Sequence, residues 1–190
     1  MKHLTILLFQ FFLFLSCSQN FKNEDWLLFE NEDIKFVTIT ETTNFDIGDF
    51  TFKAKWNNKL YFSDNIGYYG GIETLLIFEN SKLITTVNGI EDVIALGEIY
   101  FEFYDYNFDG NIDFSYPISQ GKSQWRKYYL YNKKENSFNN YKDWDYLKIQ
   151  KVNKNVKQIL SQPDGTATSG EQTLYQIKEN EIIKIKTIKY

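Results

Sequence analysis

Apolar and polar residues alternate along short stretches of this chain, and this period of two constrains its fold more than any other feature. The clearest examples are residues 50–56 and 183–188. Successive side chains of a β-strand point to opposite faces of a sheet, so strict alternation indicates a half-buried strand. No segment offers an amphipathic helix of three turns. Similar strand-like stretches are 34–40, 59–63, 73–78, 83–87, 99–106, 125–132, 146–150, 156–161 and 173–178.

Short polar segments separate these predicted strands, and their lengths are those that join hairpins. They are residues 57–58, 79–81, 133–136 and 179–180. The two prolines, Pro117 and Pro163, are expected outside the strand cores, because proline cannot donate a ladder hydrogen bond. We therefore predict an all-β, antiparallel hairpin array that is propeller-like, with a β-sandwich as the alternative.

The N-terminus has the layout of a secretory signal peptide. Lys2 precedes an apolar run over residues 4–15, which is too short to span a bilayer. The small residue Ser16 then precedes Cys17, the only cysteine, so residues 14–17 resemble a lipobox. An unpaired thiol in an oxidising compartment otherwise needs an explanation. We expect signal peptidase to cut before Cys17 and this residue to carry lipid.

Cleavage at this point would divide the chain into three parts. Residues 1–16 would be removed, residues 17–25 would form the lipidated tether, and residues 26–190 would form a single all-β domain. The two or three acyl chains of a bacterial lipoprotein hold a protein firmly on a membrane. We expect a membrane-anchored lipoprotein of the cell envelope, periplasmic or surface-facing, and the sequence leaves the choice of membrane open.

The processed chain would lack the residues that many enzymes use. His3 is the only histidine and would leave with the signal peptide, and lipidation would consume the only thiol. Loss of Lys2 would change the formal net charge from −4 to −5. Catalytic sets with His or Cys and zinc sites built from them are then excluded, although a carboxylate-pair glycosidase is permitted. Without a basic stripe, nucleic acid is not an expected partner. We predict a non-enzymatic protein with no catalytic residues, and the sequence does not indicate its oligomeric state.

Residues 105–113 have the spacing of a calcium-binding loop. Oxygen-bearing side chains stand at positions 1, 3, 5 and 9, and glycine stands at position 6. Gly110 permits a sharp turn with positive φ, and Ile112 is expected to point into the core. Oxygen donors without nitrogen or sulfur favour Ca²⁺ over transition metals. The predicted ligands are Asp105, Asn107, Asp109, Asn111 through its carbonyl oxygen, and Asp113.

Position 12 of this loop is Tyr116, where a helix–loop–helix site has glutamate. The flanking residues 101–104 and 112–114 have strand character, so we predict an EF-hand-like calcium loop set between strands. Without the twelfth ligand, we expect a Kd of about 10⁻⁴–10⁻³ M, as in extracellular modules. The alternative is an Asp/Asn-rich turn that binds no ion. Clustered carboxylates repel one another without a cation, which favours calcium.

The loop also carries a resemblance to a known family. Residues 104–114, followed by the tyrosine-rich residues 127–132 and by Phe138, resemble a family of exported bacterial β-propeller-like proteins. One branch of that family inhibits lysozyme-type peptidoglycan hydrolases and serves as immunity against such toxins delivered by type IV secretion. The resemblance covers residues 72–190 and implies calcium ligation by the loop residues named above. Residues 18–71 have no counterpart in it.

Aromatic residues supply the candidate partner-binding positions. Tyr68 and Tyr69 are predicted to stand on a glycine-flexed loop, residues 67–71, which would present rigid anchors to the cleft of a partner. The alternative is a hairpin turn whose tyrosines fold back on the sheet. We expect inhibition of a lysozyme-like hydrolase as the leading specific function. The rival is an envelope module that binds glycan or another surface protein without inhibiting it, with Trp56, Trp125 and Trp144 as a candidate sugar platform.

The lipobox generates a prediction about membrane attachment. A Cys17→Ser variant should keep the folded domain but appear in the soluble fraction after a high-salt wash, because covalent lipid is the anchor. Fractionation followed by immunoblotting measures this, with Ser18→Ala as the matched control. A Cys17→Ser variant that stays with washed membranes would show that lipidation is not the anchor.

Overall fold

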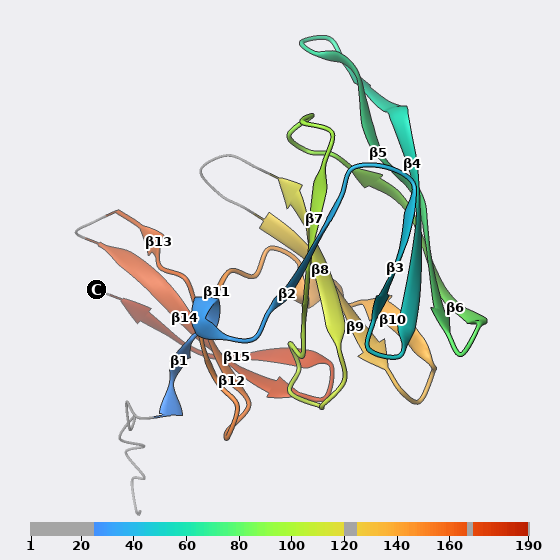
Figure 1. Ribbon diagram of the computed structural model, residues 1–190. Helices are drawn as coiled ribbons and strands as arrows, with labels where there is room; N and C mark the ends of the chain where they lie inside the picture. Colours follow the sequence, from blue (N-terminus) through green and yellow to red (C-terminus); the bar gives the residue numbers. More distant parts are fainter. Residues whose placement is uncertain (1–24, 120–124, 167–168, 190) are drawn as a thin grey trace, which may run out of the picture.

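The alternating stretches form three antiparallel sheets, and none of them closes on itself (Figure 1). The computed structural model describes residues 25–119, 125–166 and 169–189. The helical segments in these ranges are the 3₁₀ turns η2 (Phe29–Asn31) and η3 (Lys142–Trp144). Neither of these described turns has the length and apolarity that a membrane crossing requires. The all-β prediction is confirmed.

Apart from β1 and β2, which join the two later sheets, the three sheets take their strands from successive parts of the chain. The four-stranded sheet has the order β3 (Thr43–Ile47), β4 (Phe50–Ser63), β5 (Gly67–Glu79) and β6 (Lys82–Glu91). The five-stranded sheet has the order β10 (Ser137–Asn140), β9 (Trp125–Asn132), β8 (Asp113–Ser119), β7 (Ile99–Tyr104) and β2 (Lys35–Ile39). The six-stranded sheet has the order β1 (Leu27–Leu28), β11 (Ile149–Asn153), β12 (Gln158–Ser161), β14 (Gly170–Lys178) and β13 (Asp164–Gly165), with β15 (Glu181–Lys189) also paired to β14.

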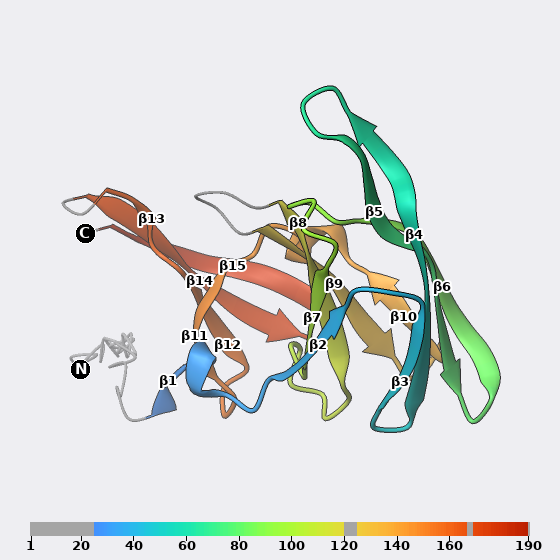
Figure 2. The ribbon, with the colours of Figure 1, turned by 45° about the horizontal axis from the view of Figure 1, so that its top comes forward.

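The five-stranded sheet lies between the other two (Figure 2). Its strand β9 shows this arrangement residue by residue. Tyr128 and Leu130 belong to a buried cluster shared with the six-stranded sheet. Tyr129 and Tyr131, which alternate with them, belong to the cluster shared with the four-stranded sheet. A strand buried on both faces carries apolar residues at successive positions, which explains the tyrosine-rich sequence of β9.

Aromatic rings fill both layers. Phe52 of β4 contacts Phe103 and Phe114 of the middle sheet, with ring centroids 5.2 and 5.8 Å away. In the second layer, Tyr106 packs edge-on against Tyr128 with centroids 4.9 Å apart. Edge-to-face pairs of this kind add to the free energy gained by burying the rings. The layered arrangement fits the sandwich alternative, and a ring of propeller blades is not seen in the described ranges.

Two local predictions were wrong. Residues 57–58 do not form a connector but lie inside β4, where the register with β5 shifts between Asn57 and Tyr61. The Asn57 side chain accepts the Lys59 N–H at 2.9 Å, so it satisfies backbone at an irregularity instead of closing a turn. Pro117 lies within β8, next to a register shift against β9, where the missing N–H is tolerated. The connectors at 79–81, 133–136 and 179–180 are confirmed, and Pro163 lies between β12 and β13 as expected.

The packing of β4 generates a stability prediction. Phe52 is fully buried, so Phe52→Ala should lower the free energy of unfolding by about 3–5 kcal/mol through lost transfer energy and a cavity. Phe62→Ala, on the same strand with its side chain 60% exposed, is the control and should change it by no more than about 0.5 kcal/mol. Urea denaturation of the two variants measures the difference. Equal effects of the two substitutions on the free energy of unfolding would contradict the burial of Phe52 between β4 and the middle sheet.

Candidate functional site

The predicted calcium loop joins β7 to β8 in the middle sheet, so any change in it acts on the sheet that both outer layers cover. Gly110 has a φ of +87°, which confirms the predicted sharp turn, and Phe108 also lies in the left-handed region with a φ of +57°. Ile112 is partly buried against the cluster that the middle sheet shares with the four-stranded sheet, as expected. The loop is therefore fixed to the core at its C-terminal end.

The polar side chains of the loop turn inward and bind its own backbone. The Asp105 carboxylate accepts the N–H groups of Asp109 at 2.9 Å and Gly110 at 2.8 Å. Asp109 in turn accepts the N–H of Asn111 at 2.8 Å. The Asn107 amide donates to Asp109 at 3.0 Å and to Asn180 in the β14–β15 turn at 2.7 Å. Asn107 thus connects the loop to the six-stranded sheet.

Asp113 has a different environment from the rest of the loop. Its side chain is fully buried at the start of β8, and its two oxygens accept the N–H groups of Tyr106 at 2.9 Å and Tyr131 at 2.8 Å. Burial raises the pKa of Asp113 well above its usual range, the hydrogen bond from Tyr131 lowers it, and the nearby carboxylates of Asp105 and Asp109 raise it further. Asp113 therefore ties the loop to β9.

The donor set fits a hard cation in part. Burial raises the pKa of Asp105, and repulsion from Asp109 adds to the increase, so these two carboxylates are close enough to interact. In the described ranges, no three His, Cys, Asp or Glu side chains form a metal-binding group. A calcium ion would therefore need amide, main-chain or water oxygens beside the carboxylates of Asp105 and Asp109.

The long hairpin of β4 and β5 projects beyond the sheets (Figure 1). Its end carries exposed apolar side chains. Phe62 and Tyr68 are directly paired across it and contact edge-to-face with centroids 5.2 Å apart. Their exposed fractions are 60% and 65%, and that of Ile66 in the turn is 58%. Leu96, in the connection between β6 and β7, is 73% exposed, and a cavity of about 460 Å³ lies between this connection and the hairpin. We call Phe62, Ile66, Tyr68 and Leu96 the hairpin-tip patch.

The two candidate tyrosines differ in exposure and in contacts. Tyr68 is exposed at the patch, whereas the Tyr69 hydroxyl donates to Glu91 of β6 and its ring stacks on Tyr61 at 5.7 Å. The hydrogen bond to Glu91 is the main reason why the pKa of Tyr69 is raised to about 12. Tyr69 therefore supports the hairpin, and Tyr68 is the residue available to a partner.

The prediction that residues 67–71 form a loop was wrong, because they begin β5. A Cβ at Gly71 would collide with the carbonyl of Ile90, and one at Gly70 would lie 2.8 Å from the ring of Trp56. These glycines permit close packing and do not supply flexibility. Sequence reasoning also missed Phe62, Ile66 and Leu96. The only signal in the sequence was an apolar residue in a polar connection, Ile66 between β4 and β5 and Leu96 between β6 and β7.

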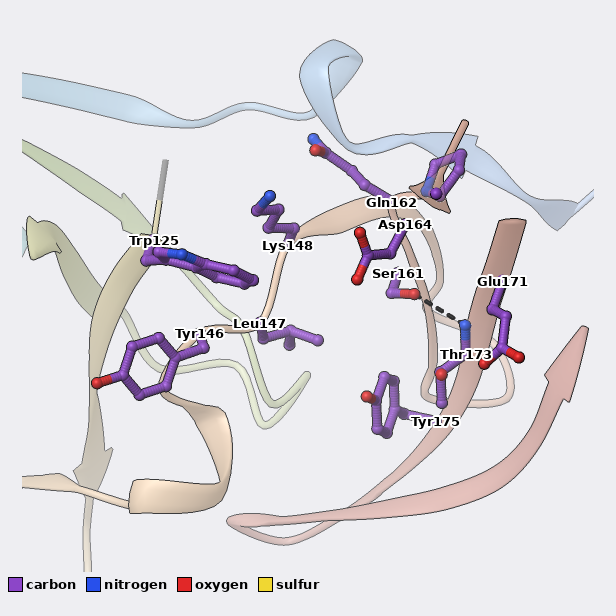
Figure 3. Close-up of a pocket in the computed structure, with 12 residues that line it drawn as sticks. Trp125, Tyr146, Leu147, Lys148, Ser161, Gln162, Asp164, Glu171, Thr173 and Tyr175 are labelled. Atoms are coloured by element: carbon purple, nitrogen blue, oxygen red, sulfur yellow. Dashed lines mark hydrogen bonds between the residues drawn. The ribbon is translucent and has the colours of Figure 1, made fainter. Parts of the chain in front are cut away.

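A groove of about 490 Å³ lies between the middle and the six-stranded sheets (Figure 3). On one side Tyr146 packs edge-on against Trp125 at 5.6 Å, and the Lys148 ammonium lies 4.2 Å above the Trp125 ring. Asp164 and Tyr175 line the other side. Tyr146 is 59% exposed and has a φ of +68°, a backbone conformation that tyrosine rarely adopts.

The three tryptophans proposed as a sugar platform lie in separate places. Trp144 is fully buried and donates its indole N–H to the Asn180 carbonyl at 2.8 Å. Trp56 packs on Gly70 in the four-stranded sheet, and Trp125 alone lines the groove. Cys17, the predicted lipidation site, lies outside the described residues. Comparisons of the chain with protein-family models, curated proteins and solved structures find no match.

The loop generates a prediction about calcium. If an ion binds the native state only, it stabilises folding by RT ln(1 + [Ca²⁺]/Kd), about 1.4–2.7 kcal/mol at ten to a hundred times Kd. Chelation should then lower the melting temperature by several degrees, since ~2–4 °C accompanies each kcal/mol in a domain of this size. Differential scanning calorimetry measures this change.

The matched variants are Asp105→Asn with Asp109→Asn against Asp46→Asn with Asp49→Asn in the β3–β4 hairpin. The first pair should melt near the chelated wild type and ignore added calcium, while the second pair should respond as the wild type does. An unchanged wild-type melt in chelator, with no calcium heat in titration calorimetry at millimolar ion, would reduce the loop to an ordinary turn.

Proposed function

We propose that this chain is a lipid-anchored, non-enzymatic binding protein of the cell envelope, and that the hairpin-tip patch contacts its partner protein. The observation that carries this proposal is the exposed Phe62–Tyr68 pair at the end of a projecting hairpin. Large apolar side chains that gather on an exposed surface mark interaction sites. Paired rings also lose little conformational entropy when they bind, which makes them suitable anchors.

The shape and charge around the patch favour a particular kind of partner. A hairpin tip is narrow enough to enter a cleft, as a flat sheet face is not. Residues 43–98, which form the four-stranded sheet and its connection to β7, contain eight acidic residues and four lysines, a formal net charge of −4. An acidic surface favours association with a basic partner and accelerates their encounter. We therefore propose a basic protein with an open substrate cleft.

A lysozyme-like peptidoglycan hydrolase is the specific partner that we propose, in an immunity-type role. Such an enzyme has a cleft for a glycan strand and acts in the envelope, where lipid on Cys17 would place this protein, facing either the periplasm or the exterior. The resemblance of residues 104–114 and 127–132 to propeller-like inhibitory lipoproteins supports the same partner. The absence of histidine after residue 3 supports a role without catalysis.

Calcium has a structural part in this proposal. Asp105, Asn107 and Asp109 would hold the ion with the Asn111 carbonyl, and Asp113 would connect this site to β9. The ion would supply positive charge between carboxylates that repel one another. The loop would thereby stabilise the middle sheet, and the hairpin-tip patch would remain the contact surface.

Inhibition assays test the proposal. Wild-type protein should slow the clearing of a peptidoglycan suspension by at least one member of a panel of lysozyme-like hydrolases. Tyr68→Ala should weaken this inhibition about 30-fold or more, the effect of removing a hot-spot anchor worth at least about 2 kcal/mol. Tyr146→Ala, which removes an equally exposed aromatic ring elsewhere, should leave it unchanged. Protection by none of the panel would leave the inhibitor role without support.

Glycan binding without inhibition is the second candidate, and the groove favours it. Trp125, Tyr146 and Tyr175 offer ring surfaces, and Asp164 and Gln162 offer polar groups, which is the composition of many saccharide sites. Titration with soluble peptidoglycan fragments distinguishes the candidates. Under the glycan hypothesis Tyr146→Ala abolishes binding and Tyr68→Ala does not. Under the inhibitor hypothesis no fragment binds the groove at millimolar concentration.

A further inference from the structure

Lysines are concentrated in the C-terminal part of the chain. Residues 35–119, which include the four-stranded sheet and strands β2, β7 and β8 of the middle sheet, contain 13 acidic residues and five lysines, a formal net charge of −8. Residues 147–189, which form most of the six-stranded sheet, contain eight lysines and four acidic residues, a net charge of +4, and residues 25–34, which contain β1 and η2, add four acidic residues beside this sheet. Two of these lie toward the middle sheet, because Glu30 lines a cavity with Glu102 and Glu32 accepts a hydrogen bond from the Tyr104 hydroxyl at 2.9 Å. The six-stranded sheet and the hairpin tip lie at opposite ends of the molecule in both views (Figures 1 and 2).

The outer face of the six-stranded sheet combines lysines with exposed apolar residues. Cross-strand pairing places Leu28, Lys151, Leu160, Leu174 and Lys186 in one row on this face, and Leu174 in the middle of the row is 3% exposed. Lys178, on the same face of β14, is paired directly with Glu181. Two residues further along, Ile183 pairs with Gln176, whose side chain donates to the Val156 carbonyl at 2.8 Å. Leu28, Val156 and Ile183 are 38%, 49% and 43% exposed. The opposite face holds the buried residues Val152, Ile159 and Ile177 of the second layer.

The chain also enters the domain at this sheet. Strand β1 pairs with β11 at its edge, and Asp25 follows Cys17 by only eight positions. A fully extended chain spans about 3.3–3.6 Å per residue, so lipid on Cys17 would be held within about 30 Å of Asp25, which lies two residues before β1. Lipid on Cys17 would therefore attach the domain to a membrane through the edge of the six-stranded sheet.

We propose that the outer face of the six-stranded sheet docks on an anionic lipid surface, with Lys151, Lys178 and Lys186 near the headgroups and Leu28, Val156 and Ile183 entering the interface. The inference rests on the proposed lipid anchor and adds an orientation to it. Each lysine near an anionic surface contributes attraction, and apolar side chains among lysines are typical of interfacial binding. Docking in this way directs the acidic hairpin tip away from the membrane, toward the space where a partner is met.

Fluorescence energy transfer to labelled lipid tests the orientation. The mature lipoprotein carries a donor on Val156→Cys or on Asn65→Cys in the hairpin turn, since lipidation leaves no other thiol. In vesicles of phosphatidylcholine with phosphatidylglycerol, transfer should be strong from residue 156 and weak from residue 65. In vesicles of phosphatidylcholine alone, or in high salt, the two positions should become similar. Equal transfer in anionic vesicles would overturn the proposal.

Charge reversal supplies the second arm. Lys151→Glu with Lys178→Glu should abolish the difference between the two labels, whereas Lys59→Glu with Lys82→Glu, the same change of charge on the four-stranded sheet, should preserve it. In the Cys17→Ser background, the first pair should reduce co-sedimentation with anionic vesicles about tenfold or more relative to the second pair. Equal binding by both pairs would overturn the docking face.

Mass spectrometry of Cys17 separates failure of this inference from failure of the anchor. If Cys17 carries no lipid and the Cys17→Ser variant still binds anionic vesicles through these lysines, the docking face stands and the lipoprotein proposal fails. If Cys17 carries lipid and the domain shows no preferred orientation on the membrane, the lipoprotein proposal stands and the docking face fails.

Discussion

Burial of both faces of the five-stranded sheet is the constraint on which the rest of the structure depends. Strand β9 directs successive side chains into two aromatic clusters, one on each face of the sheet, so loss of either outer sheet would expose a row of rings to water. The outer sheets each have one face fixed by this requirement. Their remaining surfaces are free to differ, and they do: one extends into an apolar hairpin tip, and the other presents lysines.

The loop between β7 and β8 acts on that same middle sheet. Asp113 brings a carboxylate into the core, where an unpaired charge would be costly, and two backbone N–H groups offset part of that cost. Burial and the loop carboxylates of Asp105 and Asp109 oppose ionisation of Asp113, and a cation bound in the loop would relieve the repulsion among the carboxylates. A calcium ion bound in the loop would thus stabilise the middle sheet, against which both outer sheets pack.

The sequence predicts local conformation well and long-range proximity poorly. Alternation identified most strands, and the positive φ of Gly110 followed from loop spacing alone. Asn57–Asn58 and Gly67–Gly71 were misread because turn-forming residues also serve strand irregularities and close packing. The hairpin-tip patch was missed because Ile66 and Leu96 come from different connections, and only folding of β4, β5 and β6 brings these connections together.

The central claim is that the two ends of the molecule have separate tasks, one facing a partner protein and the other the membrane. Hydrogen–deuterium exchange of the vesicle-bound lipoprotein, with and without an inhibited hydrolase, tests it most directly. The account predicts that the hydrolase slows exchange in residues 60–69 and 92–98, and leaves residues 154–161 as slow as the membrane alone made them. Slowing confined to residues 145–149 and 161–166 around the groove, with none at the hairpin, would contradict it.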